Sequence, residues 1–290
     1  MIVGHRIGVW NPRAGSQALP PGKEEDTGRV TAMSGPVEWI CEIEPPTRPD
    51  LMHVRHQIGV LSTVATAYLI PDNHVGRATV SSIAVAHEVD RMGGRSIACL
   101  NARDRNALGF RRDLLTGAAY GVDEFLFVYG DDPAAGARTG QLTVRSMIDA
   151  LRQFGDEHLG DAGRFRAGVT TRLRPLPDWK RAADFLFVQV SFDLDALLAW
   201  RDTVDFAGAV YAGVMVLPSA AMARKLVAAI PEITVPQPWL DAIERDGTAG
   251  TALACELAQT VAGSGAFDGI HLIPGVRYRE TAARLEGRRR

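Results

Sequence analysis

Two carboxylates, Glu42 and Glu44, lie in a run that reads VEWICEIEPP over residues 37–46 and is apolar apart from these two and Glu38. In a strand, successive side chains alternate between faces, so both glutamates share a face with Ile40. The proline pair that follows cannot donate hydrogen bonds to a sheet and should end the strand. A carboxylate among apolar residues is costly unless it is paired, hydrogen-bonded or protonated, so Glu42 is a candidate proton donor. For Glu44, pairing with an arginine at the rim is an equally good interpretation.

Polar side chains also follow the later apolar runs, near the point where each run ends. The carboxyl ends of the strands in a closed parallel barrel converge on one mouth, so we expect these side chains to meet there. They are Asp72, Asn73, Asn101, Arg103, Asp104, Asp131, Asp132, Thr170, Arg172, Gln189, Asp193 and His271.

Several of these candidates have a local alternative role. Asp104 or Asn106 could cap the following helix, and Asp131 could close a turn before a proline. His271 could be a hydrogen-bonded core histidine. Gln189 is harder to explain locally, because it is the one amide in an apolar run and a buried amide needs hydrogen-bond partners.

Familiar motifs of other enzyme classes are absent from the sequence. There is no metal-ligand spacing, no glycine-rich dinucleotide or Walker motif and no nucleophile elbow. We therefore expect no metal site and no Ser-His-Asp triad, and any nucleotide should bind in the barrel mouth.

Short apolar runs alternate with amphipathic stretches from residue 37 onward, and this alternation predicts a parallel β/α architecture. Such an architecture would bring the candidate residues to one end of the sheet. Strands are predicted at 37–44, 67–70, 95–100, 124–129, 166–171, 184–190, 208–217 and 269–273. Helices are predicted at 50–65, 81–92, 106–120, 141–154, 178–183, 193–203, 219–230, 239–245 and 250–262. Eight units in about 250 residues predict a single α/β domain, a (βα)8 TIM-type barrel over 37–290. Residues 1–36, poor in core-forming side chains, are predicted to be a flexible N-terminal extension.

Composition narrows the class of protein further. At 290 residues and 46% hydrophobic, the chain can bury a large core, and a net charge of −2 does not favour nucleic acid or an anionic membrane as partner. The three widely spaced cysteines suit thiols in a reducing compartment, and no apolar stretch approaches membrane-spanning length. We expect a cytoplasmic protein, with a homo-oligomer left open. The arginine-rich end, residues 284–290, is expected to be a solvated tail.

Six short stretches, in order along the chain, resemble motifs of the methylenetetrahydrofolate reductase family. They are EIEPP at 42–46, DN and GR within 72–77, RDRN at 103–106, GDDP at 130–133, QVSFD at 189–193 and GIH at 269–271. The resemblance implies a β/α barrel that reduces 5,10-methylenetetrahydrofolate to 5-methyltetrahydrofolate with electrons from NADH or NADPH.

The resemblance also implies roles for individual residues. Glu42 matches the family's general acid, Asp131 the aspartate that favours a cationic iminium intermediate, and Gln189 the glutamine that orients the pterin. An ionised Asp131 in a low-dielectric mouth would stabilise that cation. We expect the substrate to contact Gln189 together with Asp72, Asn73, Asp104 and His271. We expect the cofactor to contact Asn101, Arg103, Tyr129 and Thr170.

The sequence departs from the family's pattern where a flavin would bind. Family members that hold FAD use a long Tyr- and His-bearing segment after the fifth strand and an arginine before the Gly-Asp pair. Here the fifth strand is followed by a short connection at 172–184, Tyr129 precedes Gly130, and Cys99 stands about where the family has a histidine. The sequence therefore looks like the shorter actinobacterial-type reductases, in which a nicotinamide is thought to pass hydride directly to the folate.

We accordingly expect direct hydride transfer from NADH (or NADPH), with FAD as the fallback. One alternative is a folate-binding accessory barrel of one-carbon metabolism without redox activity. Another is a flavin-dependent barrel that acts on a different substrate.

Overall fold

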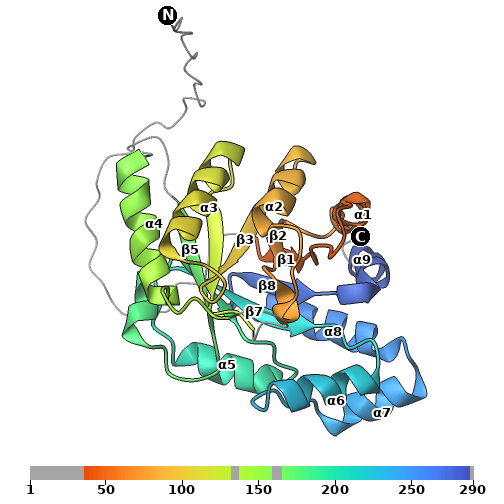
Figure 1. Cartoon of the computed structure of the whole chain (residues 1–290). Helices are drawn as coiled ribbons and strands as arrows, with labels where there is room; N and C mark the ends of the chain where they lie inside the picture. The colour runs from red at the N-terminus through yellow and green to blue at the C-terminus, as the bar shows by residue number, and fades with distance from the viewer. Residues whose placement is uncertain (1–35, 132–136, 159–164, 288–290) are drawn as a thin grey trace, which may run out of the picture. The chain divides into compact units, whose positions relative to one another are not determined.

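Eight parallel strands form a closed barrel in the computed structural model, which describes residues 36–131, 137–158 and 165–287 (Figure 1). The strands pair in chain order, and the first pairs with the last to close the barrel. They are β1 (Glu38–Glu42), β2 (Ala67–Ile70), β3 (Ser96–Asn101), β4 (Glu124–Val128), β5 (Arg166–Thr171), β6 (Phe185–Val188), β7 (Ala209–Met215) and β8 (Gly269–Ile273). The predicted (βα)8 barrel is confirmed, whereas the predicted extension up to residue 35 lies outside the described residues, as does Asp132.

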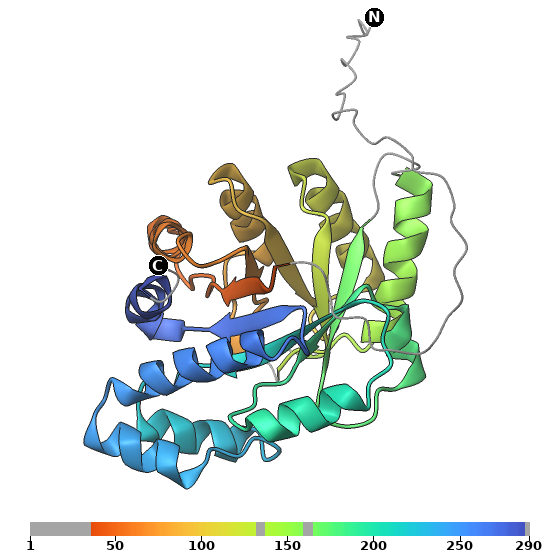
Figure 2. The ribbon, with the colours of Figure 1, turned by 180° about the vertical axis from the view of Figure 1, so that it is seen from behind.

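Helices surround the strands, as the two opposite views show (Figures 1 and 2). The α-helices are α1 (Met52–Leu61), α2 (Ser82–Arg91), α3 (Ala107–Tyr120), α4 (Val144–His158), α5 (Leu194–Asp202), α6 (Ala220–Ala229), α7 (Gln237–Arg245), α8 (Ala249–Gly263) and α9 (Tyr278–Glu286). Short 3-10 helices are η1 (His74–Gly76), η3 (Asp178–Ala182) and η4 (Gly275–Arg277). None of the described helices is long and apolar enough to cross a lipid bilayer.

The strands are buried on both faces, which explains their nearly continuous apolar sequences. Ile40, Phe187 and Tyr211 point into the barrel, while Trp39 and Cys41 pack between barrel and helices. The alternation predicted for β1 is therefore confirmed, and it places Glu42 on the inner side.

Polar side chains begin several helices at the ends predicted from sequence. Asn106 accepts a hydrogen bond from the backbone N–H of Gly109 and so caps α3, and Asp193 caps α5 in the same way through Ala196. The helix α3 ends at Gly121, whose φ of 77° lies in the left-handed region that glycine adopts without strain. Of the two local alternatives for the cap of α3, Asn106 is the correct one.

The expectation of a solvated C-terminal tail is wrong for residues 284–286, which belong to α9. This helix packs against α1 and α8 and buries Tyr278, Thr281, Ala282 and Leu285. Their spacing places them on one face of a helix, so the sequence contained a signal for this helix. The many arginines of the segment favoured the interpretation as a solvated tail instead. Residues 288–290 lie outside the described part.

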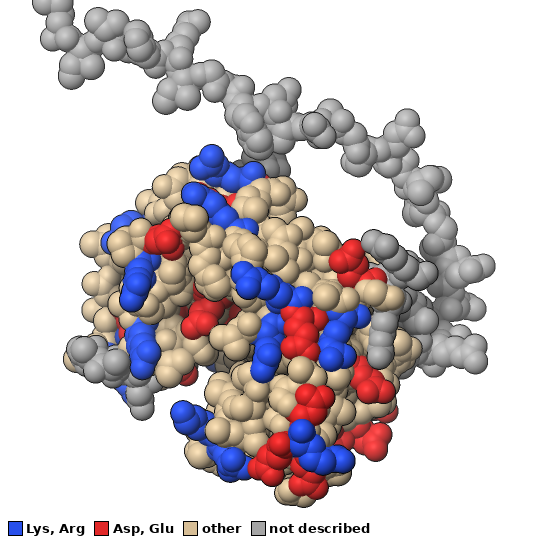
Figure 3. Space-filling model, turned by 90° about the vertical axis from the view of Figure 1, so that its right-hand side faces the viewer, with Lys and Arg blue, Asp and Glu red and all other residues tan. Residues whose placement is uncertain are grey.

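Acidic and basic side chains are interspersed on the face drawn in Figure 3. This distribution agrees with the small formal net charge of −2. Charge of one sign therefore does not dominate this face.

Candidate functional site

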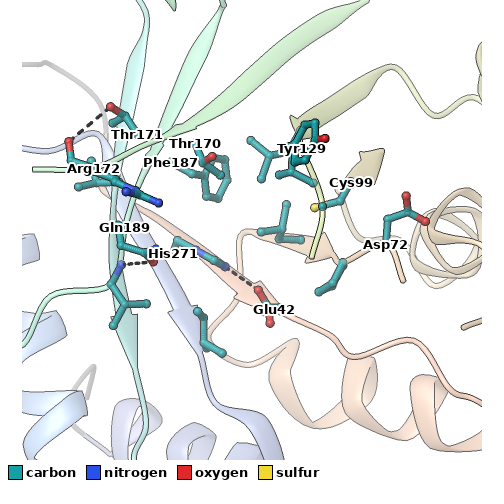
Figure 4. A pocket seen from close by; sticks show the side chains of 18 of the residues that line it. Glu42, Asp72, Cys99, Tyr129, Thr170, Thr171, Arg172, Phe187, Gln189 and His271 are labelled. Atoms are coloured by element: carbon teal, nitrogen blue, oxygen red, sulfur yellow. Dashed lines mark hydrogen bonds and ion pairs between the residues drawn. The ribbon is translucent and has the colours of Figure 1, made fainter. Parts of the chain in front are cut away.

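The carboxyl ends of the strands open on a cavity of about 570 Å³, here called the central cavity (Figure 4). Eight of the residues predicted for the site line it, and Arg172 is one of them. The others are Glu42, Asp72, Tyr129, Asp131, Thr170, Gln189 and His271. Side chains far apart in the sequence meet here because every strand points the same way.

Glu42 and His271 form a hydrogen-bonded pair in the wall of the central cavity. Glu42 ends β1 and His271 lies in the adjacent β8, where it pairs in register with Ile40. The His271 Nε2 lies 3.2 Å from the Glu42 Oε2, and the side chains are only 10% and 17% exposed. The Phe187 ring packs edge-on against the imidazole at 5.0 Å. Nε2 donates when Glu42 is ionised and accepts when Glu42 carries a proton, so this pair can hold and pass on a proton.

Gln189 lies just after β6 with one end of its amide free to bind a ligand. Its Oε1 accepts a hydrogen bond from the Val190 N–H at 2.9 Å, and its own backbone N–H donates to the carbonyl of Thr171. No hydrogen bond occupies its Nε2 within the described residues. The amide N–H groups can therefore donate into the cavity, where Figure 4 shows Gln189 beside His271.

Asp131 lies at the rim of the central cavity and is exposed to solvent. Its Oδ2 accepts a hydrogen bond from the backbone N–H of Val75 at 2.9 Å. The expectation of a low-dielectric setting for this carboxylate is therefore wrong, because the loop after β4 carries it outward. Water screens its charge until a ligand covers the rim.

Asp72 lines the central cavity, but its carboxylate is engaged by the protein. Its Oδ2 accepts hydrogen bonds from the backbone and side chain of Asn101, at 2.9 and 2.6 Å, and pairs with Arg105. In Figure 4 this carboxylate points away from His271 and Gln189. Asp72 is thus placed to fix the ends of β2 and β3.

Asn73, Asn101, Arg103 and Asp104 do not reach the wall of the central cavity, although binding roles were predicted for them. Asn101 and Arg103 are buried, and Arg103 pairs with Asp104 at 2.6 Å, which lowers the pKa of that carboxyl. The side-chain amide of Asn73 donates to the same Asp104. These contacts hold the loops after β2 and β3 together, although the buried Nη1 of Arg103 has no hydrogen-bond partner among the described residues.

Three cations line the side of the central cavity formed by the connection after β5, and only Arg172 was singled out from the sequence. The others are Arg174 and Lys180. The Lys180 ammonium donates to the carbonyl of Thr170 at 2.6 Å. Burial, followed by the charges of Arg174 and Arg172, lowers the pKa of Lys180 to about 8. The sequence did contain a signal for this cationic side of the cavity, because three basic residues occur within nine residues after the fifth strand.

Tyr129 and Cys99 occupy two positions at which the sequence departs from the flavin-binding pattern. The Tyr129 ring is half exposed, and the Arg138 guanidinium lies 5.8 Å from its centre. The Cys99 side chain lies in the barrel interior beneath the central cavity, where burial raises the pKa of its thiol. The thiol therefore stays neutral.

Within 36–131, 137–158 and 165–287, no three or more His, Cys, Asp or Glu side chains are grouped so as to hold an ion.

Fold and site together define a (βα)8 barrel with a ligand-sized cavity, lined by both polar and apolar side chains, at the carboxyl ends of its strands. A sequence model of the methylenetetrahydrofolate reductase family matches residues 70–276, well over half of the chain. The chain belongs to the methylenetetrahydrofolate reductase family. The match includes Asp131, Gln189 and His271 and begins after Glu42.

Two solved structures show the same fold. One is an uncharacterized protein from Clostridium thermocellum that binds two copies of 5-methyl-5,6,7,8-tetrahydrofolic acid; it is 12% identical, with a TM-score of 0.58 over 87% of this chain and 94% of that one. The other is the Bacillus cereus spore cortex-lytic enzyme SleL, also 12% identical, with a TM-score of 0.53 over 87% of this chain and 74% of that one. The search of curated proteins gave no match.

Proposed function

We propose that this protein reduces 5,10-methylenetetrahydrofolate to 5-methyltetrahydrofolate with hydride taken directly from NADH or NADPH. The observation that carries the proposal is the meeting of Glu42, Asp131, Gln189 and His271 around one cavity in a member of this family. Folate as the ligand is further supported by the Clostridium thermocellum protein of the same fold, which binds 5-methyltetrahydrofolate.

Glu42 is the proton donor in the proposed reaction. Protonation of N10 breaks its bond to the bridging carbon, opens the five-membered ring and leaves an iminium cation at N5. Hydride from the nicotinamide then adds to the exocyclic carbon and gives the methyl group. Glu42 suits the first step because it is nearly buried, and His271 can return a proton to it afterwards.

Gln189 and Asp131 act on the pterin and on the cation in this scheme. The free amide N–H groups of Gln189 donate to the pterin edge and orient the ring. The carboxylate of Asp131 attracts the iminium, with more effect once the bound folate excludes water from the rim.

Direct hydride transfer is favoured by the residues that stand at the family's flavin positions. A half-exposed Tyr129 replaces the arginine, and a neutral Cys99 thiol replaces the histidine. A thiol is a weak hydrogen-bond donor, so these side chains do not fit the family's contacts to FAD. The proposed mechanism uses no flavin step.

The test is NADH oxidation that depends on methylenetetrahydrofolate, with Glu42→Gln as the variant. Without a proton donor, kcat should fall about 100-fold or more. Glu44→Gln is the matched control, because Glu44 is exposed and does not line the central cavity; its kcat should stay near that of the wild type. Stoichiometric flavin in the visible spectrum of the purified protein would refute direct transfer. If wild type and Glu42→Gln bind folate but are equally inert, the accessory folate-binding barrel is the correct function.

A further inference from the structure

A second cavity of about 280 Å³ adjoins the central cavity and is called the side cavity here. The two cavities share Arg172, Arg174, Gln189 and Val190, and the far wall of the side cavity includes Asp193 and Glu232. A ligand whose ring contacts Gln189 can therefore extend into the side cavity without leaving the protein surface.

The two arginines of the side cavity sit on a rigid support. The carbonyl of Arg174 accepts a hydrogen bond from the indole N–H of Trp200 at 2.9 Å, and its backbone N–H donates to the carbonyl of Arg172 at 2.8 Å. Pro175 and Pro177 restrict the chain that follows. Little backbone entropy is then lost when an anion binds here.

Positive charge is in excess where the two cavities join. Arg172 pairs with Glu232, both about half exposed, whereas Arg174 has no acidic partner among the described residues. Asp193 is already occupied as the cap of α5. Lys180 lies near enough for both arginines to disfavour its charged form. Three cations therefore face two carboxylates, of which Asp193 is held by the backbone of α5, and a bound anion would relieve the repulsion among the cations.

We propose that the side cavity binds the anionic glutamate tail of folate, with Arg174 pairing with one tail carboxylate and Arg172 exchanging Glu232 for another. Guanidinium groups suit this role because their paired donors match a carboxylate. Glu232 competes with the ligand for Arg172 and so limits binding to tails with several carboxylates. The inference rests on the proposed function, because it takes the pterin to lie beside Gln189.

The test compares 5-methyltetrahydrofolate carrying one glutamate with the same compound carrying three, by calorimetric Kd. Wild type should bind the triglutamate about fivefold more tightly, a modest gain because the arginines are exposed. Arg174→Gln should reduce this ratio to nearly one, and Glu232→Gln should increase it. Added salt should lower the ratio in wild type. Arg181→Gln is the matched control, since Arg181 is an exposed arginine paired with Asp205 that lines neither cavity.

Equal affinities of wild type for the two compounds would overturn the inference, as would a ratio that Arg174→Gln leaves at the wild-type value. If Arg174→Gln weakens the binding of NADH but not of either folate, the side cavity binds the diphosphate of the dinucleotide, and the inference is overturned. If wild type binds the two folates equally well but has normal reductase activity, the inference is rejected and the proposed function stands. If wild type binds the triglutamate fivefold more tightly but has no reductase activity, the proposed function is rejected and the inference about the tail stands. Failure of both folates to bind rejects both.

Discussion

At the residue scale, the pairing of Glu42 with His271 holds a carboxyl group in the wall of the central cavity with only 17% of its side chain exposed. The apolar Phe187 ring packs edge-on against the imidazole of this pair. Lys180 also lines the central cavity, and burial together with the charges of Arg174 and Arg172 lowers its pKa to about 8. The electrostatics of the site should therefore change within the physiological pH range.

Ligand binding should depend on the protonation of Lys180. Its lowered pKa of about 8 keeps it charged below that pH and neutral above it. Attraction for an anionic ligand is then present at pH 7 and lost as the pH rises to 9, so the Kd of 5-methyltetrahydrofolate triglutamate should increase about threefold over this range. Lys180→Arg stays charged and should flatten the profile. An identical rise in wild type and Lys180→Arg would contradict this assignment.

At the element scale, the connection between β2 and α2 is held over the rim in a strained conformation. Asn73 and Val75 have φ values of 48° and 56°, and such left-handed angles are unusual for a β-branched valine. The backbone N–H of Val75 donates to Asp131, which ties this connection to the one after β4. Strain of this kind persists where the surrounding structure imposes it.

Val75→Gly should relieve this strain. The left-handed penalty disappears, and the greater freedom of glycine in the unfolded chain offsets part of the gain, so the free energy of unfolding should rise by about 0.5 to 1 kcal/mol. Urea denaturation measures this difference. Val75→Ala keeps a Cβ, so its free energy of unfolding should rise by less than that of Val75→Gly. A lower stability for the glycine variant than for the alanine variant would argue against a strained Val75.

The two ends of the barrel differ at the scale of the whole molecule. At the amino ends of the strands, Arg95 pairs with Glu38 at 2.7 Å and with Glu124 at 3.0 Å, and the Tyr211 hydroxyl donates to Glu38. At the carboxyl ends, Gln189 and Arg174 keep donors that no described residue accepts. Polar groups at the first end satisfy one another and support stability, whereas at the second end only some do so, and the free donors of Gln189 and Arg174 can bind a ligand.

The last helix, α9, contributes to the stability of the closed barrel. Leu285 is 2% exposed where α9 packs on α1 and α8, so Leu285→Ala should lower the free energy of unfolding by about 2 to 4 kcal/mol. Arg284→Ala, one residue earlier and exposed, is the matched control and should change it by less than about 1 kcal/mol. Similar denaturation midpoints for the two variants would contradict a packing role for α9.

The sequence by itself determined the architecture and the inward direction of Glu42. Strand alternation, helical spacing and caps such as Asn106 are set by local backbone geometry, which every short segment carries in its own sequence. The family motifs also pointed to the residues that meet at the cavity.

Only the tertiary structure decided which of those residues face a ligand. Glu42 and His271 are 229 positions apart and meet because β1 and β8 close the barrel. Asn101 and Arg103 are buried in the folded barrel and Asp131 is exposed at the rim. Burial and the nearby Arg174 and Arg172 lower the pKa of Lys180. Contacts and electric fields between distant segments depend on barrel closure, and no local pattern in the sequence encodes them.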